Sequence, residues 1–363
     1  MSLRIVHVVG ARPNFMKIAP IVRALSGDAQ FDQMLVHTGQ HYDPALSAVF
    51  LDELGLPAPD VNLGVGSGSH AVQTAEIMQR FDEVLATADA DLVLAPGDVN
   101  STLAAALVAA KRGVPVGHVE AGLRSGDLTM PEEVNRILVD RVSSLLFTPS
   151  PDADANLLAE GIAPAGIHRV GNLMIDSLVR LLPVAEAGWP RLRAELALDG
   201  PYVAVTLHRP VNVDDDASFA IVAAALERIA ERIPVVFPMH PRTRARAGRE
   251  LAGDDRLRVV DPLGYLDFLA LEAHAAAVLT DSGGIQEETT VLGVPCLTLR
   301  EATERPITVT QGTNRLVPLA ADSIVAAVDE AIDEPPGARP VPDLWDGRAA
   351  ERVAAVLRAW APA

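Results

Sequence analysis

Short apolar runs of strand length alternate with longer stretches of helical pattern along most of the chain. In the first half, apolar runs lie at residues 4–9, 31–37, 92–95, 115–119, 144–148 and 167–170. Helical patterns lie between them, at residues 12–25, 71–87, 99–112 and 151–161. Continuous apolar runs bounded by turn residues are typical of strands buried on both faces. Their alternation with helices predicts a doubly wound α/β domain with a parallel sheet.

The same alternation restarts around residue 171. A helical stretch containing Pro183, Gly188 and Pro190 comes first and predicts a hinge region, because proline and glycine interrupt helices. Further apolar runs follow at residues 202–206, 235–238, 257–260, 277–280 and 295–299. A last amphipathic helix is predicted at residues 347–360, after a proline-rich link. The pattern therefore predicts two α/β domains.

Composition and charge agree with two domains and limit the expected partners. The chain has 363 residues, which is above the size at which single hydrophobic cores stop growing. Its net charge of −18 argues against nucleic acid as a partner. No apolar run approaches the roughly 18 residues of a membrane span, and the single cysteine, Cys296, allows no intramolecular disulfide. We therefore expect a cytoplasmic protein without membrane or nucleic-acid partners.

Acidic residues follow two neighbouring predicted strands of the first half. Asp98 comes just after the run at residues 92–95, and Glu120 comes directly after the next run. Glu132 and Glu133 then begin a predicted helix that also carries Arg136. The carboxyl ends of strands in an open α/β sheet line the ligand crevice. Asp98 alone could equally cap a helix, but several carboxylates at one edge of the sheet indicate a site.

A first anion site is predicted where the first strand turns into a helix. The sequence GARPN at residues 10–14 places Arg12 at the helix N-terminus and Lys17 one turn further along. It lacks the second and third glycines of the dinucleotide fingerprint, but a strand, tight turn and helix N-terminus still attract anions. The alternative is a solvated pair of basic residues on a helix edge.

A second anion site is predicted in the other half, at residues 281–288 (DSGGIQEE). The small residues Ser282, Gly283 and Gly284 let backbone amides approach a phosphate at a helix N-terminus. Glu288 would accept hydrogen bonds from both ribose hydroxyls, and Arg305 would supply positive charge. The alternative is a glycine-rich turn capped by Ser282.

Two histidines end other strands of the same predicted domain. His208 and His240 each lie close to an arginine, and Arg209 is the neighbour of the first. The sequence contains no H-E-x-x-H, no Cys-x-x-Cys and no Walker lysine loop, so we predict neither a metal nor a cofactor. The acidic run at residues 214–216 could bind a metal, as in many glycosyltransferases, but helix capping and solvation explain it better because an apolar helix follows.

These motifs together resemble the UDP-N-acetylglucosamine 2-epimerases of the non-hydrolysing bacterial type. The resemblance covers nearly the whole chain and rests on GARPNFMKIAP (10–20), HTGQHYD (37–43), PGDVNST (96–102), GHVEAGLRSGD (117–127), PEEVNR (131–136), GN..ID (171–176), LHRP.NVDD (207–215), HPR (240–242), YLDF (265–268), DSGGIQEE (281–288) and ERP…GTN (304–314). It implies a GT-B-like fold in which two Rossmann-like doubly wound domains face a central cleft. Residues 1–170, joined by the C-terminal helix 347–363, would form the first domain, and residues 171–346 would form the UDP-binding second domain.

The resemblance also implies a role for each matching residue. The catalytic residues would be Asp98, Glu120, Glu132 and His208, with His208 assisting the departing UDP. The substrate-binding residues would be Arg12, Lys17, Arg136, Arg209, His240, Phe268, Ser282, Gly283, Gly284, Glu288 and Arg305. The implied reaction converts UDP-GlcNAc reversibly to UDP-ManNAc by eliminating UDP to a glycal and adding it back, in a homodimer.

Two departures from the family pattern and several alternative functions remain. Val211 stands where many members have Glu, which removes one carboxylate near the leaving group. Members regulated by a second substrate molecule carry Gln where this chain has Asp43, so the resemblance does not imply allosteric activation. The alternatives are a hydrolysing epimerase that releases ManNAc and UDP, a GT-B glycosyltransferase, and a non-catalytic nucleotide-sugar sensor.

Overall fold

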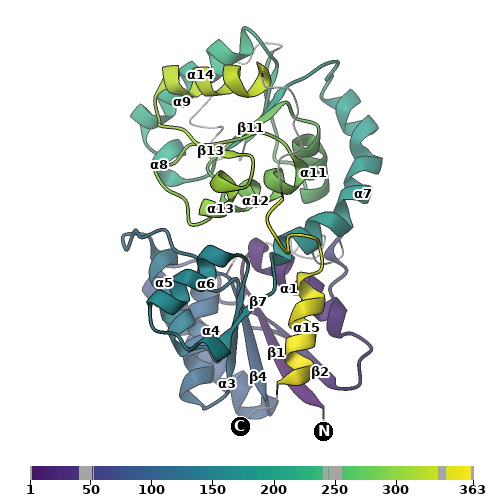
Figure 1. Cartoon of the computed structure of the whole chain (residues 1–363), viewed down its shortest axis with the longest axis vertical. Coiled ribbons are helices and arrows are strands. Elements are labelled where there is room, and N and C mark those ends of the chain that lie inside the picture. Colours follow the sequence, from purple (N-terminus) through teal and green to yellow (C-terminus); the bar gives the residue numbers. More distant parts are fainter. Residues whose placement is uncertain are drawn as a thin grey trace. The chain divides into compact units, whose positions relative to one another are not determined.

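The computed structural model describes residues 2–40, 51, 53–239, 244, 256–333 and 341–360. The chain divides into two compact units (Figure 1). The first unit is formed by Met1–Ser177 and Asp343–Ala363, and the second by Leu178–Pro342. Among the helices in these described ranges, none is long and apolar enough to cross a membrane.

The first unit is built on a seven-stranded parallel sheet. In chain order its strands are β1(Leu3–Val9), β2(Phe31–His37), β3(Val61–Asn62), β4(Leu92–Pro96), β5(Val116–Val119), β6(Leu145–Thr148) and β7(Ile167–Arg169). In space they follow the order β3-β2-β1-β4-β5-β6-β7, so the order reverses between β1 and β4. Ligands of open α/β sheets bind at such a switch point, beyond the carboxyl ends of the strands. The turns after β1 and β4 therefore lie where a site is expected.

Helices cover both faces of this sheet. They are α1(Arg12–Leu25), α3(His70–Ala88), α4(Asn100–Lys111), α5(Pro131–Val142) and α6(Pro151–Ala159), with α7(Leu173–Glu195) leading out of the unit. The buried residues Ile77, Phe81 and Leu85 recur every fourth position along α3 and form its core-facing stripe. The predicted strands and helices of this half are confirmed, but the two-residue strand β3 was not predicted, because it is too short for an apolar period.

The second unit repeats the architecture with a six-stranded parallel sheet. Its strands are β8(Val203–Thr206), β9(Val235–Pro238), β10(Leu257–Val260), β11(Ala277–Thr280), β12(Cys296–Thr298) and β13(Asn314–Leu316), in the order β10-β9-β8-β11-β12-β13. Its helices are α8(Pro210–Val213), α9(Asp216–Ala230), α11(Tyr265–Ala273), α12(Gly283–Leu292), α13(Pro306–Thr310) and α14(Ala321–Asp333). Here the switch point lies between β8 and β11, which are followed by His208 and by the glycine-rich turn.

The C-terminal segment returns to the first unit. Its helix α15(Ala349–Ala359) lies beside α1 (Figure 1). The carboxylate of Asp176 accepts hydrogen bonds from the backbone N–H groups of Ala349 (2.9 Å) and Ala350 (2.7 Å), and so caps α15. The indole of Trp345 donates to the carbonyl oxygen of Pro149 at 2.9 Å. The stretch predicted as a hinge region is helical, since α7 continues through Pro183 and Pro190 as one helix.

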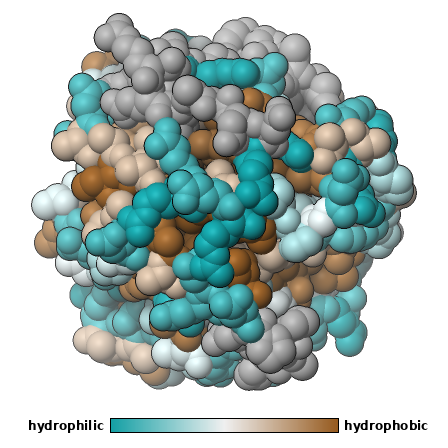
Figure 2. Space-filling model, turned by 90° about the horizontal axis from the view of Figure 1, so that it is seen from above, coloured by the Kyte–Doolittle hydropathy of each residue, from teal (hydrophilic) through white to brown (hydrophobic). Residues whose placement is uncertain are grey.

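Hydrophilic and hydrophobic residues are interspersed on the face that Figure 2 shows. Large exposed apolar side chains of the described residues, such as Val72, Leu158 and Val211, come from separate helices. Scattered apolar residues of this kind are normal on protein surfaces.

Candidate active site

The turn after β4 carries Asp98 and is locked to the turn after β1. Gly97 has a φ of +68°, and a Cβ there would lie 3.1 Å from Lys17 Nζ and 3.3 Å from Asn14 Nδ2. Asn14 Nδ2 also donates to the carbonyl oxygen of Pro96 at 2.8 Å. The close approach of the two turns therefore requires glycine at position 97.

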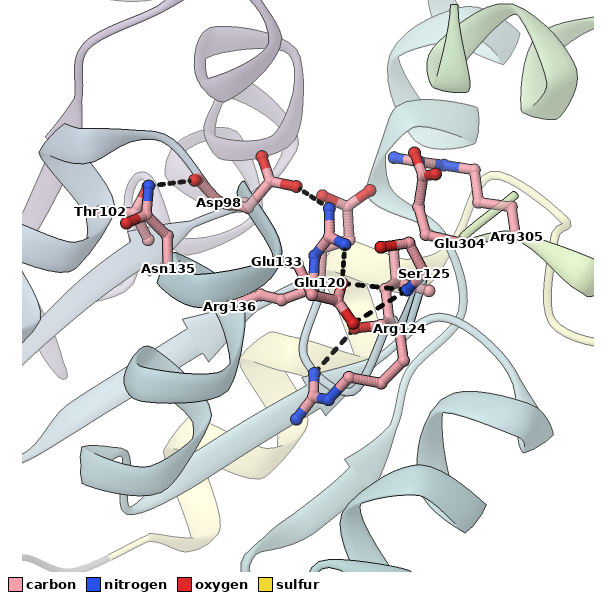
Figure 3. A network of polar contacts seen from close by, with 12 residues as sticks. Asp98, Thr102, Glu120, Arg124, Ser125, Glu133, Asn135, Arg136, Glu304 and Arg305 are labelled. Carbon is pink, nitrogen blue, oxygen red and sulfur yellow. Dashed lines mark hydrogen bonds and ion pairs between the residues drawn. The ribbon is translucent and has the colours of Figure 1, made fainter. Parts of the chain in front are cut away.

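Asp98 does not cap a helix. The N-cap position of α4 is Val99, which makes no side-chain capping bond. The carboxylate of Asp98 instead pairs with Arg136 at 2.5 Å (Figure 3). Asn135, one residue earlier on α5, donates to the backbone carbonyl of Asp98 at 2.8 Å. Two successive residues of one helix thus hold the main chain and the side chain of Asp98, and the capping interpretation is wrong.

Glu120 lies in a strained backbone position beside Lys17. Its φ is +73°, a left-handed value that is uncommon for a residue with a side chain and is found disproportionately at functional sites. The carboxylate forms an ion pair with Lys17, and both side chains are more than nine-tenths buried. Lys17 is therefore not a solvated cation. The pair lines a small pocket with Phe147, Pro149 and residues 171–173.

The two adjacent glutamates of α5 have different surroundings. Glu133 is buried and accepts hydrogen bonds from the backbone N–H groups of Ser125 and Gly126, both at 2.9 Å, and it pairs with Arg136. Burial opposes its charge, but these partners outweigh burial and hold the pKa of Glu133 below its ordinary value. The side chain of Glu132 is half-buried and makes no hydrogen bond or ion pair with another described residue. Glu133 therefore holds Arg136 in place, and Glu132 is available to a ligand.

A buried histidine connects the turn after β4 to helix α5. His118 is fully buried, with Nδ1 2.5 Å from Asp140 Oδ1 and Nε2 2.8 Å from the carbonyl oxygen of Gly97. Both ring nitrogens of His118 therefore face oxygen atoms. Asp140 also binds Arg124, at 2.7 Å. Burial works against the ionised carboxylate, but His118 and Arg124 lower the pKa of Asp140.

Sequence reasoning missed the His118 and Asp140 pair. The available signal was a histidine in the middle of an apolar strand, which alone predicts only a buried polar group. Its partner on α5 lies 22 residues further along the chain and could not be identified from spacing.

A polar cluster joins three more of the motif segments in the first unit. Gln40 Oε1 accepts hydrogen bonds from the backbone N–H (3.1 Å) and hydroxyl (2.6 Å) of Ser101, whose hydroxyl also lies 2.8 Å from Thr38 Oγ1. A Cβ at Gly10 would lie 2.0 Å from that hydroxyl oxygen. The turns after β1, β2 and β4 therefore meet. Arg12 begins α1 and is exposed, while Asp43 lies outside the described residues.

The glycine-rich turn of the second unit is packed on Arg305. Ser282 is the N-cap residue of α12 but makes no side-chain capping bond, so the capped-turn alternative is wrong. A Cβ at Gly283 would lie 2.5 Å from Arg305 Nη1. Arg305 pairs with Glu304 and, at 2.8 Å, with Glu287. Its charge is thus balanced by two carboxylates directly beneath the turn.

Glu304 is itself held ionised. It also pairs with Arg300, at 2.6 Å. Burial opposes the charge, but Arg305 and Arg300 outweigh it and hold the pKa of Glu304 far below its ordinary value. The support of the glycine-rich turn is therefore a buried network of two arginines and two glutamates.

Glu288 points to the hydroxyl of Tyr265, which donates to Glu288 Oε1 at 2.7 Å. Glu272 is fully buried nearby, and burial together with the charge of Glu288 raises the pKa of Glu272 well above its ordinary value. Phe268 is half-buried on α11, the helix that begins with Tyr265. Tyr265 belongs to the YLDF motif but was given no role from sequence, and Glu272, four residues after that motif, was not identified.

The remaining predicted residues lie at the end of β8 or beyond the described part of the chain. His208 is exposed and Arg209 is half-buried in the loop before α8. His240 lies outside the described residues.

Asp215 caps α9 by accepting from the backbone N–H of Ser218 at 2.8 Å, which confirms the capping interpretation of the acidic run. Within the described ranges, no group of His, Cys, Asp and Glu is arranged to hold a metal ion.

Two Rossmann-like units with functional turns at their switch points define an α/β protein of the GT-B-like class. The family model described as UDP-N-acetylglucosamine 2-epimerase matches residues 23–358. The chain therefore belongs to the UDP-N-acetylglucosamine 2-epimerase family, and the family and fold predicted from its motifs are confirmed.

Relatives and solved structures agree over nearly the full length. The chain is 44% identical to the UDP-N-acetylglucosamine 2-epimerase homolog of Methanococcus maripaludis, over 87% of this chain and 88% of that one. It is 40% identical to the UDP-2,3-diacetamido-2,3-dideoxy-D-glucuronate 2-epimerase of Pseudomonas aeruginosa, over 89% and 90%. The UDP-GlcNAc 2-epimerase of Methanocaldococcus jannaschii, solved in complex with UDP-GlcNAc and UDP, superposes with a TM-score of 0.90 at 39% identity and covers 99% of this chain and all of that chain.

Proposed function

We propose that this protein interconverts UDP-GlcNAc and UDP-ManNAc by eliminating UDP to a glycal, returning a proton to C2 from the other face of the ring and adding UDP back at C1. The observation that carries the proposal is the carboxylate cluster of the first unit. Asp98 and Glu120 follow neighbouring strands, each is held by a cation, and Glu120 keeps a left-handed backbone. Membership of the 2-epimerase family and the likeness to a relative solved with UDP-GlcNAc support the choice of reaction and substrate.

The chemistry of the substrate explains the need for carboxylates. C2 of the sugar is not acidified by a carbonyl group, so cleavage of the C1–O bond builds positive charge on the ring. Negative groups fixed near that charge stabilise the transition state. Removal and return of the C2 proton also need acid–base groups. Glu132 can take up a proton without breaking an ion pair to a described residue, whereas ionised Asp98 and Glu120 are stabilised by Arg136 and Lys17.

The nucleotide is assigned mainly to the second unit in this proposal. The glycine-rich turn would bind phosphate through backbone N–H groups at the start of α12. Glu288 would accept from the ribose and Phe268 would contact the nucleotide. Arg209, His240 and Arg305 would add positive charge or hydrogen bonds, and His208 would assist the leaving group. Arg12 would reach the diphosphate from the first unit, so that residues 1–170 with 347–363 serve the sugar and residues 171–346 serve UDP.

One experiment tests the reaction. The protein is incubated with UDP-GlcNAc in D2O, and the products are followed by ¹H NMR. We expect UDP-ManNAc with deuterium at C2, because the C2 proton exchanges with the acid–base groups. Epimerised product that keeps hydrogen at C2 would exclude the elimination mechanism. Release of free ManNAc would instead favour the hydrolysing alternative. A parallel reaction with EDTA tests the proposal that no metal is needed.

A second substrate belongs in the same experiment. The relative with 40% identity is a UDP-2,3-diacetamido-2,3-dideoxy-D-glucuronate 2-epimerase, so identity alone does not separate the two sugars. We expect kcat/KM to be higher for UDP-GlcNAc. The reverse order would keep the reaction and correct the substrate. We further propose a cytoplasmic homodimer, which sedimentation equilibrium of the purified protein tests.

A further inference from the structure

The second unit holds a buried carboxylate, Asp281, directly behind His208. Asp281 is fully buried at the end of β11, next to β8 in the sheet. Its oxygens accept from the backbone N–H groups of His208 (3.1 and 3.2 Å) and Arg209 (2.9 Å), and from Asn212 Nδ2 (2.9 Å). The ring of His208 completes the set, with Nδ1 2.9 Å from Asp281 Oδ1.

These contacts determine which histidine nitrogen carries a proton. Burial opposes ionisation, but the hydrogen bonds from His208, Asn212 and Arg209 outweigh it and lower the pKa of Asp281. A carboxylate that remains ionised only accepts hydrogen bonds, so the proton of neutral His208 belongs on Nδ1. The His208 side chain is 63% exposed although Nδ1 contacts a buried atom. The opposite ring nitrogen, Nε2, is therefore the one presented outwards.

We infer that Asp281 is a positioning residue that holds His208 with Nδ1 protonated and presents Nε2 for proton exchange with departing and returning UDP. The inference rests on the proposed function. On elimination the C1–O bond breaks and its electron pair goes to the β-phosphate oxygen, which takes the proton from Nε2 of the imidazolium. The C2 proton passes to a carboxylate of the first unit, and the C2–H pair forms the C1=C2 bond. On re-addition a proton reaches C2 from the opposite face of the ring, the β-phosphate oxygen bonds to C1, and its proton returns to Nε2 of His208.

The same carboxylate also has a purely structural effect that must be separated from this role. By binding the main chain of His208 and Arg209, Asp281 joins the loop after β8 to the glycine-rich turn after β11. Asn212 contributes only to this connection, since its Nδ2 contacts Asp281 and the carbonyl oxygen of Leu299. Asn212→Ser therefore provides a matched control that weakens the connection and leaves the contact between Asp281 and the His208 ring.

The first test measures the tautomer of His208 directly and does not depend on the activity of any variant. The wild-type protein is labelled with ¹⁵N-histidine, and the His208 signals are assigned by their loss in His208→Gln. At a pH where the ring is neutral, we expect the proton on Nδ1 and an unprotonated Nε2. Histidine in water prefers the other tautomer, so a proton on Nε2 of His208 would overturn the inference whatever the activity of the enzyme.

The second test is kinetic. Orienting partners of a functional histidine are typically worth about 10–100-fold, so Asp281→Asn should lower kcat by about that factor with KM changed less than about threefold. Added to His208→Gln, Asp281→Asn should cause less than about a threefold further loss, because it acts through the histidine. Asn212→Ser should stay within about threefold of wild type. Additive losses, or an equal loss in Asn212→Ser, would show a structural role only.

Failure of the proposed function and failure of the inference about Asp281 give different results. A wild-type protein that does not epimerise UDP-GlcNAc would overturn the proposed function, while the NMR measurement would still decide the arrangement of Asp281 and His208. An active enzyme with the proton on Nε2 would leave the function standing and remove the inference.

Discussion

The two units place functional turns at the same point of similar sheets, yet they use carboxylates in opposite ways. In the first unit, Asp98 and Glu120 stand at the turns themselves and are held by cations from behind. In the second unit, Glu287 and Glu304 are buried beneath the turn and hold Arg305. In the proposed function the carboxylates at the turns act on the sugar, whereas Glu287 and Glu304 position an arginine that would bind an anion. We therefore propose that this residue type serves catalysis at the turns of the first unit and supports the glycine-rich turn of the second.

The largest effect is expected from removing charge at the first unit's turns. Asp98→Asn, Glu120→Gln and Glu132→Gln keep the side-chain shape, and each should lower kcat by at least about a hundredfold, the usual scale for positioned acid–base or charge-stabilising groups. UDP affinity, measured by calorimetry, should change little because UDP is assigned to the other unit. If UDP affinity collapsed and turnover stayed normal, the division of roles between the units would be wrong.

The next effect concerns the support of those turns. His118→Gln leaves the buried Asp140 without its ring partner, and a buried polar group that loses its hydrogen-bond partner typically costs about 1–3 kcal/mol of stability. We expect a lower melting temperature and a kcat reduced about 10–100-fold, the scale for residues that orient functional groups.

His7 provides the matched control for that variant. It is equally buried in the same sheet, but burial lowers the pKa of His7 to about 4, and its Nε2 bonds only to Gln33, at 2.9 Å. His7→Gln removes a neutral ring and should leave kcat within about threefold of wild type. Equal kcat losses in the two variants would show that His118 acts on global stability alone.

The sequence predicted the sheets, the switch-point turns and the family because these depend on local patterns. Strand-length apolar runs and turn residues mark β4 and Asp98 without knowledge of their neighbours. Which cation faces which carboxylate was not predictable, since Lys17 and Glu120 are 103 residues apart in the chain. Pairing across that distance depends on strand order, and the apolar pattern does not encode it. Asp140 was missed for the same reason, since its partner His118 lies 22 residues earlier on another element.

A smaller effect is expected at the second unit's turn. Gly283→Ala places a methyl group 2.5 Å from Arg305 Nη1 and 2.8 Å from Glu304 Oε1. Arg305 must move, and the backbone N–H groups above it move as well. We expect UDP affinity to fall about tenfold, or about 1.4 kcal/mol. Gly264→Ala is the control, because its Cβ would meet no atom within 4 Å. Unchanged UDP affinity in Gly283→Ala would argue against phosphate binding at this turn.

The smallest effect is expected on stability alone, at Asp176, whose carboxylate caps α15 and connects it to the first unit. Burial raises the pKa of Asp176 from 3.8 to about 6, against the two backbone N–H groups that favour its charge. A raised folded pKa means that its stabilising contribution is complete below the unfolded pKa and is lost as pH rises through about 6. Asp176→Asn removes this dependence. The melting temperature of Asp176→Asn minus that of wild type should therefore be larger at pH 8 than at pH 5.5. We expect about 2–4 °C for each kcal/mol by which ionisation of Asp176 destabilises the wild-type fold. Asp343→Asn, at an exposed acid in the same segment, should show no such trend. A difference for Asp176→Asn that is constant with pH would show that the carboxylate stays ionised throughout the range.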